Sequence, residues 1–204
     1  MLIQGNQGQT GKQTGQNLTG SFGEYGDQLA SALMPRYYEN TYRGQKFSAC
    51  NTAVVTVGVL AATNVSFALY NPPNSGKNLV IVNAAFGVGS TTFATGAMFT
   101  AYNPQTTAPT NTTALTVRGN LLNGANAASV AQAFSTATLS STPVPIAPIF
   151  SFATSATVGS PAQTLNWDAA GQLILAPGGV LSFQGSVAAL VVGFAGMTWD
   201  EIPV

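Results

Sequence analysis

Short runs of strand-forming residues, separated by turn-forming residues, recur along most of this chain and restrict it to an all-β fold. From residue 47 onward, runs rich in Val, Thr, Ala and aromatic residues alternate with clusters of Asn, Pro and Gly. Pro fixes one backbone angle, and Gly and Asn tolerate left-handed conformations, so such clusters favour turns. Strands at this spacing predict an antiparallel β-sandwich or a barrel. The expected strands are 47–60, 65–70, 78–88, 97–102, 113–122, 134–139, 146–152, 163–167, 172–175, 180–185 and 187–199.

Two segments have helical patterns instead. At 27–34, Asp27 can cap a short helix that Pro35 would end. At 125–133, alanines raise helix propensity, and Val130 and Phe134 lie at helical spacing. We therefore expect one short helix in each segment.

Charge divides the chain into two parts. Residues 1–46 hold seven of the twelve charged residues, and the other 158 residues hold five. The first 23 residues are rich in Gly, Gln, Asn and Thr, so alone they cannot bury enough apolar surface to offset conformational entropy. We expect an extended N-terminal arm, 1–46, containing one short helix, followed by a β-sandwich domain, 47–204.

The residue types that the chain lacks exclude several kinds of chemistry. Without histidine, the commonest general base and metal ligand is absent, and one cysteine, Cys50, permits neither an intrachain disulfide nor a cysteine-based zinc site. Zero net charge disfavours electrostatic capture of nucleic acid or anionic membrane. The apolar run 187–197 is too short to span a bilayer, and no secretory signal is visible. We expect no enzymatic activity, cofactor, metal, direct nucleic-acid contact or membrane contact.

Three acids remain as candidates for the paired carboxylates of a sugar-active enzyme: Asp168, Asp200 and Glu201. In an extended strand Asp200 and Glu201 point to opposite faces and cannot cooperate. The simpler interpretation makes these two solvated charges near strand ends. Asp168, shortly before a glycine, then begins a turn.

Tyrosine and arginine cluster where the arm meets the domain. Arg36, Tyr37, Tyr38, Tyr42 and Arg43 could stack on bases or pack internally, but the arm carries only four basic residues against three acids. Tyr and Arg are enriched at protein interfaces, so these five residues are predicted to anchor the arm on a partner protein.

Exposed aromatic residues beside polar groups are typical of glycan-binding sites. Tyr70, Tyr102, Trp167 and Trp199 are the candidates in this chain. The alternative, which we favour, is that these four side chains belong to the core.

The low content of charge points to assembly. Charged residues make up 6% of the chain, whereas about 25% is ordinary for a globular domain. Uncharged strands lack the Lys and Glu that normally block edge-to-edge pairing, and interface cores are likewise depleted of charge. We expect a component of an assembly rather than an isolated enzyme.

Three motifs resemble structural proteins of tailed-bacteriophage virions: NPPNSGKNLVIV at 71–82, LAPGGVLSF at 175–183 and GMTWDEIPV at 196–204. The resemblance implies a β-sandwich, often jelly-roll-like, that decorates or cements the head, commonly as a trimer, or belongs to the tail or fibre base. It supplies no catalytic residues. The Pro-Gly turn of the family corresponds to Pro177 and Gly178, with a structural role.

The function predicted from these observations is a capsid decoration or cement protein of a bacteriophage. It would form a homo-oligomer, with a trimer favoured, and bridge neighbouring subunits by binding the major capsid protein or other virion proteins. It would be located in the virion after assembly in the host cytoplasm. The alternative is a tail or fibre-base component that binds host-surface glycan, with Trp167 and Tyr102 as the residues to test.

Overall fold

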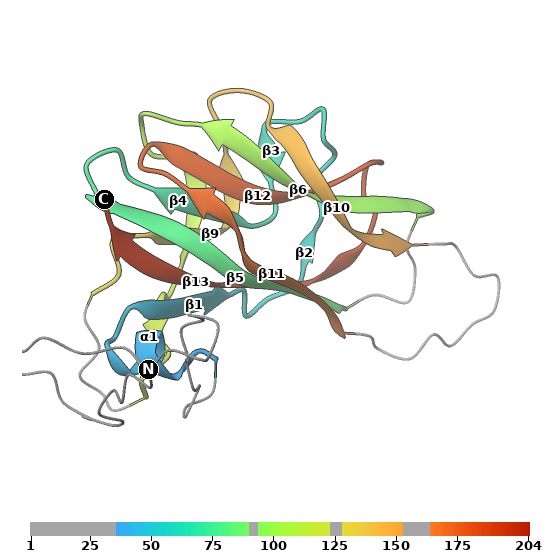
Figure 1. Cartoon of the computed structure of the whole chain (residues 1–204). Helices are drawn as coiled ribbons and strands as arrows, with labels where there is room; N and C mark the ends of the chain where they lie inside the picture. Colours follow the sequence, from blue (N-terminus) through green and yellow to red (C-terminus); the bar gives the residue numbers. More distant parts are fainter. Residues whose placement is uncertain (1–35, 90–93, 123–127, 153–163) are drawn as a thin grey trace, which may run out of the picture. The chain divides into compact units, whose positions relative to one another are not determined.

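A computed structural model describes residues 36–89, 94–122, 128–152 and 164–204. The chain divides into two units, Met1–Glu39 and Asn40–Val204, and each is treated by itself. The described residues form one short helix and thirteen strands (Figure 1). These elements are α1 (Tyr38–Tyr42), β1 (Lys46–Cys50), β2 (Val55–Thr56), β3 (Asn64–Val65), β4 (Ala68–Asn71), β5 (Lys77–Val88), β6 (Gly96–Pro104), β7 (Thr110–Leu115), β8 (Arg118–Gly119), β9 (Gln132–Thr138), β10 (Val144–Phe152), β11 (Thr164–Leu175), β12 (Gly179–Gly185) and β13 (Val192–Pro203).

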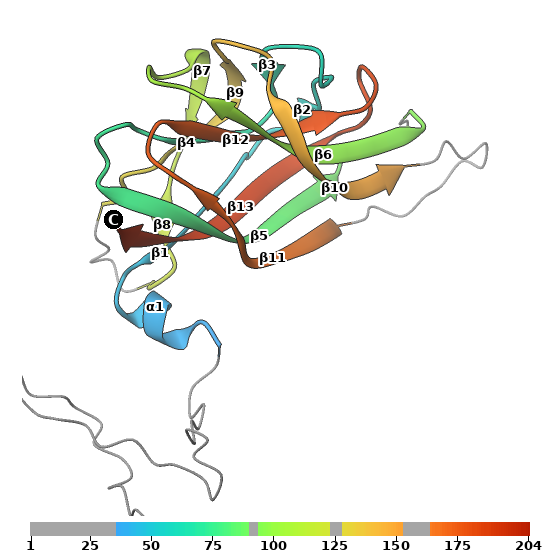
Figure 2. The ribbon, with the colours of Figure 1, turned by 45° about the horizontal axis from the view of Figure 1, so that its top comes forward.

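Two sheets face each other in the second unit, which confirms the all-β sandwich (Figures 1 and 2). The six-stranded sheet has the order β11-β5-β13-β1-β8, and β2 also pairs with β13. The seven-stranded sheet has the order β10-β6-β12-β4-β9-β3, and β7 also pairs with β9. All the pairings between these strands are antiparallel.

Four of these pairings are nested, which means that the two strands of each pair enclose the next pair in the sequence. β1 pairs with β13, β4 with β12, β5 with β11, and β6 with β10. Successive nested pairs alternate between the six-stranded and the seven-stranded sheet. The eight strands therefore wind as one long antiparallel ribbon folded across the two layers.

The core between the sheets is aromatic and aliphatic. Phe47 and Trp199 lie on paired positions of β1 and β13, with ring centroids 6.5 Å apart, and both are buried. Phe67 and Phe183 form a second ring contact at 5.5 Å. Complete burial of one such side chain contributes about 1.5–3 kcal/mol, so these contacts hold the layers together.

A smaller apolar cluster lies on the other face of the seven-stranded sheet. Along β4, Leu69 belongs to the main core whereas its neighbours Ala68 and Tyr70 belong to the second cluster. Phe134 and Val180, which pair with these two neighbours, are members of the same cluster. Because successive side chains of a strand point to opposite faces, this sheet is buried on both sides at β4.

Two long edge strands contain irregularities that limit further pairing. β10 carries Pro145 and Pro148, and its register against β6 shifts after each of them. β11 bulges between Asp168 and Leu173, where Ala170 and Gly171 have positive φ angles of 49° and 83°. Proline removes a ladder donor, and a bulge bends a strand away from its neighbours.

Some expected elements differ from the observed ones. The helix predicted at 27–34 lies outside the described residues, and the one described helix is α1. The helix predicted at 125–133 is wrong in its described part, because 128–131 are not helical and β9 begins at Gln132. The expected strands 163–167 and 172–175 are one strand, β11, interrupted by its bulge, and the strand expected at 47–60 is divided into β1 and β2.

Candidate functional site

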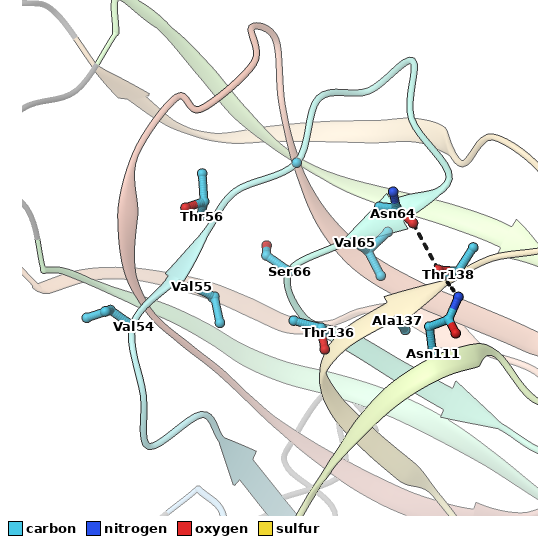
Figure 3. Close-up of a pocket in the computed structure, with 11 residues that line it drawn as sticks. Val54, Val55, Thr56, Asn64, Val65, Ser66, Asn111, Thr136, Ala137 and Thr138 are labelled. Atoms are coloured by element: carbon cyan, nitrogen blue, oxygen red, sulfur yellow. Dashed lines mark hydrogen bonds between the residues drawn. The ribbon is translucent and has the colours of Figure 1, made fainter.

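The candidate site is an open groove of about 560 Å³ that lies between parts of both sheets (Figure 3). One side is formed by β2 and the residue before it, Val54. The other side is formed by β3, by the end of β9 and by Asn111 of β7. Ser66, which follows β3, lies between the two sides.

Hydroxyl and amide groups of three strands are linked on one side of the groove. Asn111 donates through Nδ2 to Thr138 Oγ1 at 3.4 Å, and Thr138 Oγ1 donates to Asn64 Oδ1 at 2.9 Å (Figure 3). Asn111 takes up the positive φ of 48° that asparagine tolerates better than most residues. The three side chains thus form a fixed row of uncharged polar groups.

Ser66 is the most unusual lining residue. It is 3% exposed, and its hydroxyl has no hydrogen-bond partner among the described residues. Buried polar atoms without a partner are rare and cost about 1–3 kcal/mol each. A ligand in the groove that satisfied this hydroxyl would recover part of that cost.

Tight packing beside the groove requires glycine. A Cβ atom at Gly58 would lie 2.6 Å from the Asn64 carbonyl oxygen, closer than real Cβ atoms come to any atom. Gly58 therefore lets the chain after β2 approach the chain at β3, which sets the width of the groove.

Among the residues that the structure describes, none that lines this groove is charged or aromatic. A second, smaller hollow of about 260 Å³ lies over β1, β5 and β13, and Arg118 is the one charged residue among its described lining. The free, exposed Cys50 lines that hollow too. In neither hollow do the described lining residues include a ring on which a sugar could stack or an acid that could transfer a proton.

The five predicted anchor residues fall on both sides of the unit boundary. In the first unit, the Arg36 guanidinium lies 5.0 Å from the centre of the Tyr37 ring, and Tyr38 is 42% exposed. In the second unit, Tyr42 is 63% exposed and Arg43 is also exposed. None of the five lines the groove, so their role as a partner-binding site stays a prediction.

The interpretation of Asp200 and Glu201 as solvated charges is wrong. Asp200 is 6% exposed and pairs with the buried Lys46, with 2.6 Å between Nζ and Oδ1. The side-chain amide of Asn40 also donates to Asp200, at 2.8 Å. Lys46 and Asp200 occupy paired positions of β1 and β13, which brings the two charges together.

Glu201 makes a larger set of contacts at the end of β13. Lys77 Nζ lies 2.9 Å from Oε2, and the Ser129 hydroxyl donates to Oε1 at 2.5 Å. The backbone N–H groups of Val130 and Ala131 also donate to this carboxylate, at 3.1 and 3.4 Å. Glu201 therefore fixes the segment that precedes β9.

Asp168 lies where the turn interpretation predicts. Its carboxylate accepts a hydrogen bond from the Ala170 N–H at 2.9 Å, inside the bulge of β11. This contact supports the left-handed residues that follow, so its geometry is that of a turn.

Of the four aromatic candidates for glycan binding, Tyr70 and Trp199 are buried at 3% and 0% exposure. Burial raises the pKa of the Tyr70 hydroxyl above its ordinary value. Trp167 packs against the core, and Tyr102 is 38% exposed. The interpretation as core residues is confirmed for Tyr70 and Trp199.

Across the described ranges, no three His, Cys, Asp or Glu side chains lie together as metal ligands would. Among the same residues, no helix has the length and apolar character needed to cross a membrane. Comparison of the chain with protein-family models, with curated proteins and with solved structures finds no match.

Residues at the groove could not be found from sequence. Thr, Ser and Asn are common along the whole chain, so Ser66, Thr136 and Thr138 carry no distinguishing pattern. The buried acids, in contrast, could have been found from sequence. Asp200 and Glu201 directly continue an apolar strand, and a charged residue buried in such a strand requires a partner.

Proposed function

We propose that this chain is a structural subunit of a bacteriophage particle, and that it decorates the head and bridges neighbouring subunits. The observation that carries the proposal is the nearly uncharged exterior of the second unit. Only seven charged residues fall in 40–204, and two ion pairs occupy four of them. Those outside the two pairs are Arg43, Arg118 and Asp168.

Such an exterior suits a surface that is covered in an assembly. Hydroxyl and amide groups lose less hydration energy on burial than charges do, and they can pair with similar groups across an interface. Large apolar side chains are also exposed, among them Ile174 at 61%, Val144 at 61% and Phe194 at 42%. A solitary protein gains nothing from these features, whereas a bound subunit can bury them.

The winding of the strands supports the same proposal. We infer from the four nested pairings that the sandwich is a jelly roll, an architecture used in viral capsid domains and in lectins. Fold alone does not give function. Between these two uses, the groove without aromatic rings favours the capsid role over sugar binding.

The test uses particles that lack this protein. Heads from a phage with the gene deleted are mixed with the purified full-length chain, sedimented, and imaged by electron cryo-microscopy. We expect binding at a fixed number of copies per head, density for a β-sandwich on the outer surface, and retention of DNA at higher temperature. Absence of binding to heads, or density at the tail instead, would refute the role in decoration.

The arm can be tested in the same assay. We expect the N-terminal arm, 1–46, to lie across neighbouring subunits and tie them together. A chain beginning at Arg36 lacks most of this arm, although it keeps the predicted anchor residues, and should lose binding to heads. Its circular dichroism and melting temperature should match those of the full chain. Unchanged binding by the shortened chain would contradict a role of the arm.

A further inference from the structure

We propose that the groove beside β2 receives an extended segment, drawn from residues 1–23, of a second copy of this chain. The choice of a second copy rests on the proposed function, in which neighbouring subunits are linked. The groove itself is argued from the geometry of β2, from Ser66 and from the uncharged character of its described lining residues.

The edge of β2 favours a polypeptide as the occupant. Val55 and Thr56 pair with Gly193 and Val192 of β13, and Val57 N–H donates to the Val191 carbonyl at 3.0 Å. Because backbone groups of an antiparallel strand alternate in direction, those of Thr56 point away from β13. β13 is the single strand with which β2 pairs in the described part of the chain. An extended polypeptide can bond to such an edge, and Thr56 lines the groove.

The lining of the groove selects an uncharged segment. The side opposite β2 presents the linked row of Asn64, Asn111 and Thr138, with Thr136 beside it. The buried hydroxyl of Ser66 still requires a partner. A segment rich in amides can supply hydrogen bonds to these groups, whereas a charged side chain would lose hydration without gaining an ion pair.

Residues 1–23 have the required composition. They comprise six Gly, five Gln, three Thr, two Asn and one Ser, and Lys12 is their single charged residue. Thirty-five residues precede Arg36, and a fully extended stretch of that length reaches about 115 Å. A segment of this length is long enough to reach the groove on the sandwich of a neighbouring copy.

Cross-linking between full-length chains tests the assignment. In a Cys50→Ser background, one chain carries Gln9→Cys and a second carries Thr136→Cys, an exposed lining position. The two chains are mixed and treated with a short bismaleimide. We expect a product that contains one chain of each kind. A matched control replaces Thr136→Cys by Ile174→Cys, which is 61% exposed and does not line the groove.

Equal yields at positions 136 and 174 would overturn the inference. So would a chain carrying both Gln9→Cys and Thr136→Cys that links only within itself. An excess of unlabelled chain should lower the yield of the cross-linked product. Thr136→Trp fills the groove of the unlabelled chain but leaves its residues 1–23 intact, so this variant should lower the yield less than Thr112→Trp, which changes β7 outside the lining. Saturable binding of a neutral oligosaccharide, seen as NMR shifts at Thr136 and Thr138 without the cross-link, would also refute the inference.

The two proposals fail in different ways. Selective cross-linking by a protein that does not bind heads would refute the decoration role and leave the groove assignment intact. Binding to heads without selective cross-linking would refute the groove assignment alone.

Discussion

Replacing Glu201 with glutamine should destabilise the fold by about 3 kcal/mol, although the two side chains have nearly the same shape. Glu201 is fully buried and receives hydrogen bonds from Ser129 and from the N–H groups of Val130 and Ala131. Hydrogen bonds to a charged acceptor contribute about 1.5–3 kcal/mol each, and glutamine keeps only one neutral acceptor oxygen.

A matched substitution of the other partner separates the ion pair from these hydrogen bonds. The Lys77 side chain is 31% exposed, so its charge stays partly hydrated when Glu201→Gln removes the ion pair. Lys77→Met leaves the donors from Ser129, Val130 and Ala131 in place to compensate the buried carboxylate, so we expect a smaller loss than for Glu201→Gln, about 1–2 kcal/mol.

Urea unfolding of the full-length variants gives the free energies of unfolding, and amide hydrogen exchange reports on the segment itself. In Glu201→Gln, the Val130 and Ala131 amides should exchange faster than in Lys77→Met. If both substitutions cost the same, or if exchange at these two amides is unchanged, the role of Glu201 in fixing the segment is refuted.

Three further predictions concern other positions. Gly193→Ala places a Cβ against the Gly87 carbonyl oxygen, where there is no room for it, and should lower the free energy of unfolding in urea by about 3 kcal/mol. Gly76→Ala, with open space but a φ of 66°, should lower it by about 1 kcal/mol. Tyr70 has a pKa raised by burial, so the unfolded chain releases this proton at lower pH than the folded one, and stability should fall as pH rises above about 10. Tyr70→Phe should flatten this alkaline slope, and an unchanged slope would contradict the assignment. Asp168→Ala removes the bond to the Ala170 N–H and should lower the melting temperature slightly, by the equivalent of about 1 kcal/mol, whereas Asp168→Asn should recover most of it.

Sequence reasoning located most strands because local chemistry determines them. β12 and β5 match their expected ranges within one residue, since turn residues bound each run of apolar residues. The helix expected at 125–133 was wrong in its described part because the hydrogen bonds of Val130 and Ala131 to Glu201 outweigh the helix propensity of alanine.

What sequence could not give was contact between distant residues. Lys46 and Asp200 are separated by more than 150 positions, and only the pairing of the first and last long strands brings them together. The groove likewise depends on how β2, β3 and β9 meet, which no local pattern encodes. Its polar residues are ordinary in type and become distinctive only through burial and position.

The prolines of β10 and the bulge of β11 have a consequence for a protein with so few charges. Many sheets carry lysine or glutamate on their edge strands, and the charge keeps other strands from pairing there. Salt weakens this electrostatic effect. In this protein, further pairing at the edges of β10 and β11 is hindered by the N–H groups that Pro145 and Pro148 lack and by the bent backbone after Asp168. Salt cannot screen either feature, so the free edges of β10 and β11 resist edge-to-edge aggregation equally at low and at high ionic strength.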